Sequence, residues 1–311
     1  MMIVITGTIA FDYIMNFPGE FKDHVLPSQS HQINLSFIVN KFAKRRGGTA
    51  GNVSYSMGLL KTPHTLFSVA GSDFEEYRKK LEELGIDCSK VSIKEVEHSS
   101  TGFAMTDATN NQIWGYFYGA SDHIKDLKLN SIAKRGDLIL VGPSGAEGSM
   151  SFIDQCITQR IEYAFDPGFI LTQVKNEDLA KGVKHAKYIF GNDYEIKLIK
   201  DRIKSSENEW KDKIVVTTLG EKGATVAAEG RTHKIKAAQP KALIDPTGAG
   251  DAFRAGFLAG LEKVLDLKTC GEMGSTAASF CLEEYGTQEH IFTKQEFEKR
   301  YRQTYGHMLK F

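Results

Sequence analysis

Short apolar runs alternate with segments of helical periodicity along most of this chain. Six runs are strand-like, and most of them are short and apolar on both faces: 3–7, 65–70, 138–142, 163–166, 188–191 and 214–219. Strands that are apolar on both faces are typical of a parallel sheet with helices on both sides. The pattern therefore predicts an α/β fold with a mainly parallel central sheet.

Seven further segments have the periodicity of helices. They are 50–60, 74–84, 178–186, 194–204, 252–265, 268–282 and 294–309. In 252–265, for example, Phe253, Phe257 and Leu261 recur on one stripe of a helix. Strands that alternate with helices predict three layers, α/β/α. Because no repeat, low-complexity tract or Pro-rich linker interrupts the pattern, residues 1–311 are expected to form a single domain.

Two segments differ from the buried runs. Residues 30–39 alternate polar with apolar side chains, as a half-exposed strand does, and residues 102–119 indicate a hairpin that turns near Asn110 and Asn111. We expect both to project from the helix-covered sheet. They form either a mobile cover over a site or a short edge sheet that does not move.

Composition excludes several classes of protein. Lys plus Arg equals Asp plus Glu at 39 each, so no overall charge attracts nucleic acid or an anionic membrane. The four cysteines form no C-x-x-C pair and the histidines form no H-x-x-x-H motif. The sequence therefore argues against a structural metal site. No apolar run reaches the ~18 residues of a spanning helix, and the N-terminus lacks a basic signal region. We expect a cytoplasmic protein with reduced thiols.

A glycine-rich turn near the C-terminus is the candidate chemical site. Residues 245–253 read Asp-Pro-Thr-Gly-Ala-Gly-Asp-Ala-Phe and run directly into a predicted helix. Gly248 and Gly250 allow the backbone N–H groups to point to one place, and the helix dipole favours an anion there. Asp251 follows at the mouth of this turn, where it can take the proton of a hydroxyl that receives a phosphoryl group. The alternative is that Asp251 only caps the helix.

Four motifs resemble those of the ribokinase-like (PfkB) sugar and nucleoside kinases. Residues 245–257 resemble the C-terminal signature of that family, and 46–52 (Arg-Gly-Gly-Thr-Ala-Gly-Asn) its N-terminal Gly-Gly signature. Between them, 192–195 (Asn-Asp-Tyr-Glu) resembles the Asn-x-x-Glu element, and 217–223 is similar to the nucleotide-binding strand and turn. The resemblance extends from residue 3 to residue 289. It implies a ribokinase-like three-layer α/β/α fold with a small β lid, formed by residues 11–46 and 91–120, that closes over the acceptor.

The resemblance also implies roles for individual residues. Asp251 is the expected general base, and Gly248, Ala249 and Gly250 are expected to stabilise the transferring group. The expected ATP-site residues are Asn192, Thr218 and Gly220, and Glu195 is expected to help place Mg²⁺ through water. Some relatives depend on K⁺, which is therefore a further candidate cofactor. Arg254 is either a phosphate contact or an exposed helix residue.

The acceptor is indicated by a more specific similarity to bacterial adenosine kinases of this family. It lies in 6–19, 35–39, 46–48 and 286–289. It implies that Asp12, Gly48 and Asn52 hold the ribose hydroxyls, that Ser36 contacts the substrate, and that Phe103 stacks on the purine. Taken alone, Asp12 reads as a turn residue, Asn52 as a helix-start residue and Phe103 as core. After Asp166-Pro167 the chain has Gly-Phe-Ile where adenosine kinases have polar residues, including glutamine, which leaves a broader nucleoside range open.

The expected function is transfer of the γ-phosphoryl group of Mg·ATP to the 5′-hydroxyl of adenosine, giving AMP in purine salvage. A ribokinase- or fructokinase-like sugar kinase and a broad-specificity nucleoside kinase are the alternatives. A Rossmann-type oxidoreductase is disfavoured because G-x-G-x-x-G is missing after the first strand, and a ligand sensor without catalysis is disfavoured by Asp251. The expected partners are a nucleoside and ATP, with no nucleic acid and no membrane, and a homodimer through the lid is a candidate assembly.

Overall fold

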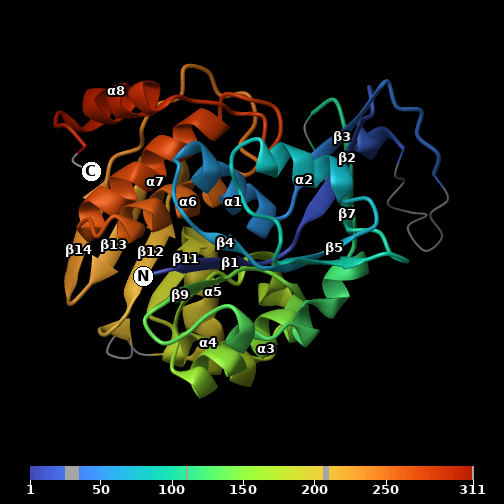
Figure 1. Ribbon diagram of the computed structural model, residues 1–311. Helices are drawn as coiled ribbons and strands as arrows, with labels where there is room; N and C mark the ends of the chain where they lie inside the picture. Colours follow the sequence, from blue (N-terminus) through green and yellow to red (C-terminus); the bar gives the residue numbers. More distant parts are fainter. Residues whose placement is uncertain (25–34, 110, 206–209, 310–311) are drawn as a thin grey trace.

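An eight-stranded sheet lies at the centre of the protein (Figure 1). The computed structural model describes residues 1–24, 35–109, 111–205 and 210–309. In spatial order the strands are β14 (Arg231–Ile235), β13 (Ala224–Ala228), β12 (Ile214–Thr218), β11 (Tyr188–Asn192), β10 (Glu162–Phe165), β9 (Leu138–Val141), β1 (Ile3–Thr6) and β4 (Thr65–Leu66). Neighbours from β4 to β12 are parallel, and β13 and β14 are added antiparallel. The predicted mainly parallel sheet is confirmed.

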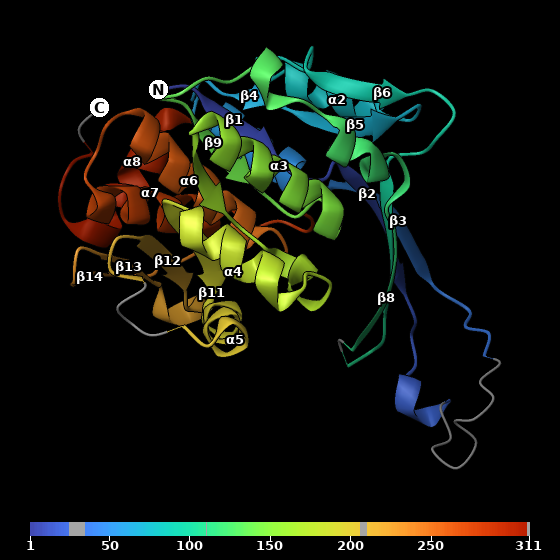
Figure 2. The same cartoon turned by 90° about the horizontal axis from the view of Figure 1, so that it is seen from below.

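Helices cover both faces of this sheet (Figures 1 and 2). One layer holds α1 (Thr49–Leu59), α2 (Glu75–Glu82), α6 (Ala249–Glu262), α7 (Leu267–Cys281) and α8 (Lys294–Tyr305), and the other holds α3 (Gly145–Gln159), α4 (Asn176–His185) and α5 (Asp193–Ile203). Successive residues of β1 alternate between the layers: Ile3 and Ile5 pack with Phe257 of α6, and Val4 packs with Phe152 of α3. This alternation produces two apolar cores and the predicted three-layer fold.

Some elements differ from the prediction. The run 65–70 divides into β4 and β5 (Ser68–Gly71), and β5 pairs with β6 (Val91–Lys94) in a separate two-stranded sheet. Helix α3, whose first turn contains two glycines, was not predicted, nor were β13 and the largely polar β14. The last helix ends at Tyr305 because Gly306 adopts a left-handed conformation (φ 79°).

A four-stranded sheet projects from the body of the protein (Figure 2). Its order is β3 (Lys41–Gly47), β2 (Ala10–Asn16), β7 (Ser100–Thr106) and β8 (Gln112–Phe117). The predicted hairpin is confirmed as β7 and β8. The strand predicted at 30–39 is not observed: residues 30–34 lie outside the described residues, 35–39 are not a strand, and β3 follows them instead. Residues 91–94 of the second expected lid segment belong to β6 and its separate sheet.

None of the helices in the described ranges combines the length and the apolar character that a membrane-spanning helix requires.

Candidate active site

The candidate site lies at the carboxyl edge of the central sheet. Asn192 is the last residue of β11 and is paired with Thr218, the last residue of β12. Asp166 follows β10 directly, and its N–H donates to the oxygen of Val141 at the end of β9 (3.0 Å). In open α/β sheets this edge is where ligands bind. The structure therefore brings residues from distant motifs to one edge.

The glycine-rich turn forms the N-terminus of α6 as predicted. Gly248 is the N-cap, with φ 80°, and a Cβ on it would lie 2.8 Å from the side chain of Thr287. The N–H groups of Gly250 and Asp251 make no hydrogen bond within the described ranges, whereas that of Ala249 makes a long one, 3.3 Å, to the Pro246 oxygen. Unpaired N–H groups at a helix N-terminus attract anions. The turn therefore has the geometry that an anion-binding site requires.

Asp251 is not the cap of α6. It lies in the first turn, and its Oδ2 accepts a hydrogen bond from Asn52 Nδ2 at 2.8 Å. The side chain is only 16% exposed, and burial raises the pKa of Asp251 against the opposing effects of Arg254 and Asn52. Because Gly248 takes the cap position, the capping alternative fails for Asp251.

A chain of hydrogen bonds fixes the orientation of Asn52. Its Oδ1 accepts from Thr287 Oγ1 and from Gln288 Nε2, both at 2.8 Å. The amide nitrogen is thereby directed to Asp251. The sequence analysis gave no role to Thr287 or Gln288 individually, because the contacts join residues more than 230 positions apart, with separations of 235 and 236.

Asp12 lies on β2 in a cradle of two glycines. It pairs with Gly102 of β7, where a Cβ would lie 2.5 Å from Asp12 Oδ1, and Gly47 of β3 is as close to the other oxygen. Neither carboxylate oxygen accepts a hydrogen bond from the described part of the chain. Burial raises the pKa of Asp12 to about 6. The carboxylate of Asp12 is therefore partly buried and offers two acceptor oxygens without donors.

Gly48 makes the entry to α1 and brings three segments together. It is the N-cap of α1 with φ 84°, and a Cβ would lie 2.5 Å from the Thr8 oxygen and 2.7 Å from the Ala10 nitrogen. Only glycine allows this backbone approach. Asn52 lies in the first turn of α1 that this cap begins, and its side chain contacts Asp251.

Asn192 and Glu195 form a reciprocal cap at the start of α5. Asn192 Oδ1 accepts from the Glu195 N–H, and Glu195 Oε2 accepts from the Asn192 N–H, both at 2.8 Å. Glu195 Oε1 makes no hydrogen bond in the described ranges. No group of three or more His, Cys, Asp or Glu residues that could hold a metal occurs among the described residues.

A cavity of about 470 Å³ opens beside the glycine-rich turn. It is lined by Thr218 and Gly220, by Ala249 and Gly250, and by Phe253 of α6 together with residues of the 237–246 segment and α7. The expected ATP-site residues Thr218 and Gly220 therefore share one cavity with the anion-binding turn. This cavity has the size of a small-molecule site.

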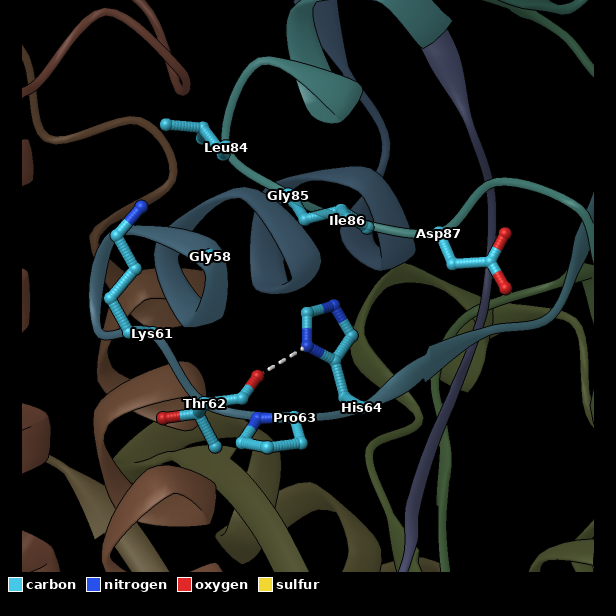
Figure 3. A pocket seen from close by; sticks show the side chains of 9 residues that line it. All are labelled: Gly58, Lys61, Thr62, Pro63, His64, Leu84, Gly85, Ile86 and Asp87. Carbon is cyan, nitrogen blue, oxygen red and sulfur yellow. Dashed lines mark hydrogen bonds between the residues drawn. The ribbon is translucent and has the colours of Figure 1, made fainter.

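A second cavity of about 520 Å³ lies at the opposite end of α1 (Figure 3). It is lined by 61–64 and 84–87 and by Gly58, and His64 Nδ1 donates to the Thr62 oxygen at 2.9 Å. None of the predicted site residues borders it.

Two predicted substrate residues are not brought to Asp12. Ser36 is exposed beside Phe37, whose ring packs against Phe17 and Phe21. Phe103 pairs with Tyr13, the neighbour of Asp12 along β2, and therefore lies on the opposite face of the four-stranded sheet.

Other aromatic side chains share the face of Asp12. Tyr116 is the register partner of Gly102, and Trp114 is the partner of Ala104. The Tyr116 ring lies 5.5 Å from that of Phe169, which follows β10 at the sheet edge. The face that carries Asp12 and Tyr116 is therefore the one turned toward the site.

Arg254 is buried at this edge and is not an exposed helix residue. Its Nη2 donates to Asp166 Oδ1 at 2.7 Å, its Nε lies 2.5 Å from Asp166 Oδ2, and its Nη1 lies 3.8 Å from Asp251 Oδ1. No role was predicted for Asp166 from the sequence. Its position directly after a predicted buried strand could have indicated a site residue.

Comparison with known proteins identifies the family over most of the chain. The family model of the pfkB family carbohydrate kinases matches residues 13–294. The nucleoside kinase of Methanothermobacter thermautotrophicus is 32% identical over 318 residues, which cover 98% of this chain and 97% of that protein.

Solved structures agree. The Burkholderia thailandensis nucleoside kinase in complex with inosine has a TM-score of 0.86 and 32% identity, and the match covers 99% of this chain and 100% of that one. Its complex with ADP-inosine has a TM-score of 0.86 and 34% identity, and the match covers 99% of this chain and 97% of that one. The nucleoside kinase of Methanocaldococcus jannaschii, an archaeal member of the ribokinase family, has a TM-score of 0.85 and 28% identity. The match covers 97% of this chain and 99% of that one. The chain, with its ribokinase-like fold, belongs to the pfkB family of carbohydrate kinases.

Proposed function

We propose that this chain transfers the γ-phosphoryl group of Mg·ATP to the 5′-hydroxyl of a nucleoside, with adenosine as preferred acceptor and AMP as the product, a step of purine salvage. One observation carries the proposal: Asn52 holds the buried Asp251 carboxylate beside the free N–H groups that begin α6. When a hydroxyl attacks a phosphoryl group, a general base takes its proton and nearby N–H donors stabilise the negative charge on the phosphoryl oxygens. The relatives named as nucleoside kinases, one of them bound to inosine, support a nucleoside as acceptor.

Asp251 acts as the general base. It takes the proton of the 5′-hydroxyl while the O5′–Pγ bond forms; the bond from Pγ to the bridging oxygen breaks, and ADP leaves with the electron pair. The turn Gly248-Ala249-Gly250 and its N–H groups stabilise the charge on the transferring group. Because burial raises the pKa of Asp251, its carboxylate is a stronger base than that of a free aspartate.

ATP occupies the cavity that Thr218 and Gly220 line, with its phosphates toward the N-terminus of α6. Asn192 and Glu195 help to place Mg²⁺ through water. The donor set fits this role because Glu195 keeps Oε1 free and Mg²⁺ prefers oxygen ligands and retains several waters. When bound, Mg²⁺ neutralises charge on the phosphates.

Asp12 binds the 2′- and 3′-hydroxyls of the ribose. Two carboxylate oxygens without donors, in a cradle that only glycines leave open, suit a vicinal diol. Gly48 and Asn52, at the start of α1, complete this ribose site, and Asn52 also contacts the general base Asp251. The four-stranded sheet then acts as a lid that closes over the nucleoside and excludes water.

The nucleobase of the acceptor stacks on the aromatic face of the lid. Trp114 and Tyr116 are on the side of Asp12, and Phe169 faces Tyr116. These rings take the role first expected of Phe103. Aromatic faces discriminate between bases less than a hydrogen-bonding edge does, and this observation favours the second candidate, a nucleoside kinase with a broad base range.

Phe103 belongs to an apolar stripe on the other face. It stacks on Tyr13 (5.5 Å), which stacks on Phe42 (5.8 Å), and Phe42 and Phe103 are 64% and 47% exposed. An exposed aromatic stripe of this kind is suited to association. We assign it to a homodimer formed through the lid.

The test compares adenosine with 2′-deoxyadenosine in the wild type, Asp12→Ala and the control Asp23→Ala. Asp23 is an exposed aspartate in the connection from β2 to β3. A hydrogen bond to a charged group contributes about 1.5–3 kcal/mol, so the ribonucleoside should be preferred by about 10- to 150-fold in kcat/KM. Asp12→Ala should lose most of that preference, and the control should keep it. Faster phosphorylation of ribose or fructose than of any nucleoside would identify a sugar kinase instead.

A further inference from the structure

Arg254 presents an unused donor to the anion-binding turn. It lies one helical turn after Gly250, and helical side chains point toward the N-terminus. A Cβ on Gly250 would lie 2.7 Å from Arg254 Nη1, so this nitrogen lies directly against the turn. Nη1 makes no hydrogen bond within the described ranges, and its distance of 3.8 Å to Asp251 Oδ1 is too long for one.

Asp166 holds the guanidinium from the other side. Its Oδ1 accepts a hydrogen bond from Nη2 at 2.7 Å, and its Oδ2 lies 2.5 Å from Nε in an ion-pair contact without hydrogen-bond geometry. The two contacts orient the group and leave Nη1 directed at the turn. Asp166 is 1% and Arg254 13% exposed. An ion pair that served stability alone would not require the third nitrogen to face the site.

The charges around the turn need a cation. Asp251, Asp166 and Glu195 all act electrostatically on Arg254, and Arg254 opposes the burial-raised pKa of both aspartates. Burial opposes the charge on the guanidinium, but Asp166 and Asp251 outweigh it and raise the pKa of Arg254, so the residue stays charged. A phosphoryl group that approaches three carboxylates is repelled unless a cation lies among them.

We propose that Arg254 is a catalytic residue whose Nη1 donates to a non-bridging oxygen of the transferring γ-phosphoryl group, and that Asp166 is the positioning residue that orients it. The inference rests on the proposed kinase function and deepens it. The bonds that form and break are those of the proposed transfer: the hydroxyl proton goes to Asp251 and the electron pair leaves with ADP. Arg254 neither gains nor loses a proton, and it stabilises charge that is greatest in the transition state.

The test uses Arg254→Ala, Asp166→Asn and the double variant, assayed with Mg·ATP and the best acceptor of the wild type. Arg254→Ala should lower kcat by about 10²–10³ with little change in KM for the nucleoside. The single variant leaves Asp166 buried without its partner and risks misfolding. The double variant removes both charges and keeps the test independent of that risk.

The double variant separates the two roles. If Arg254 served only to neutralise Asp166, kcat would return toward the wild-type value once both charges are removed. The proposal predicts that kcat of the double variant stays at the level of Arg254→Ala. Asp166→Asn should lower kcat when it is the only substitution, but it should have no further effect on kcat when Arg254→Ala is already present.

Chemical rescue supplies a second readout. Free guanidinium ion should raise kcat of the double variant and leave the wild type unchanged, because it can enter the space left by the side chain. Wild-type kcat in the double variant, or no response to guanidinium, would overturn the inference. A wild type that phosphorylates neither nucleosides nor sugars would instead refute the proposed function, so the two failures are distinguishable.

Discussion

Replacing Asp12 by asparagine should stabilise the free protein while it destroys its preference for ribonucleosides. Burial raises the pKa of Asp12 from 3.8 to about 6, and no donor in the described chain compensates the ionised form. At 1.36 kcal/mol for each pKa unit, this corresponds to about 3 kcal/mol as an upper value. Asparagine has nearly the same shape and carries no charge. The cost of ionising this partly buried, unpaired carboxylate in the free protein is offset only when the diol binds.

The stabilisation by Asp12→Asn should depend on pH, because the raised pKa of Asp12 links its protonation to folding. Between pH 4 and 6 the folded protein holds a proton on Asp12 that the unfolded chain has already released, so Asp12 lowers the unfolding free energy as the pH rises through this range. Urea titrations should therefore find wild type and Asp12→Asn equally stable near pH 4 and the variant about 2–3 kcal/mol more stable at pH 7. Asp23→Asn, the exposed control, should show no such difference. A variant that is not stabilised at pH 7, or is stabilised equally at both pH values, would mean that Asp12 is an ordinary satisfied turn residue.

Three further substitutions address the rest of the site. Asp251→Asn should lower kcat by about 10²–10⁴ with ATP affinity and Tm nearly unchanged, because Gly248 caps α6; a sharp fall in Tm with less than a tenfold loss of kcat would refute its role as base. Glu195→Gln should raise the Mg²⁺ concentration for half-maximal rate and leave the nucleoside KM unchanged, and an unaltered Mg²⁺ titration would leave Glu195 as a helix cap only. Phe103→Glu should convert a dimer to monomers in light scattering because it places a charge in the aromatic stripe, whereas Val264→Glu, 90% exposed elsewhere, should not; a dimer that survives Phe103→Glu would exclude this face.

Local chemistry made the central sheet and the anion-binding turn predictable from the sequence. The glycine spacing of 245–253 determines a turn and a helix start without reference to the rest of the chain. Apolar runs identified β1, β9, β10, β11 and β12 because these strands lie in the sheet between the helix layers, whereas the run 65–70 divides into β4 and β5. The polar β14 lacks that signal, and so it was missed.

Features that depend on register or on distant contacts were not predictable. Alternation along β2 and β7 shows that neighbouring residues face opposite sides, but only the pairing of Asp12 with Gly102 places Phe103 away from the site. The pair of Arg254 and Asp166 joins residues 88 positions apart. A single sequence contains no local signal for such a contact.

The central claim is that Asp251 activates the 5′-hydroxyl of a nucleoside for attack on ATP. The most direct measurement is the rate of ADP release from Mg·ATP by wild type and Asp251→Asn with adenosine, inosine, cytidine, ribose and fructose, with the phosphorylated position of the product assigned by NMR. We expect adenosine to have the highest kcat/KM, 5′-AMP to be its product, and Asp251→Asn to be slower by at least about 100-fold. Faster turnover of ribose or fructose than of every nucleoside, or undiminished turnover by Asp251→Asn, would contradict the account.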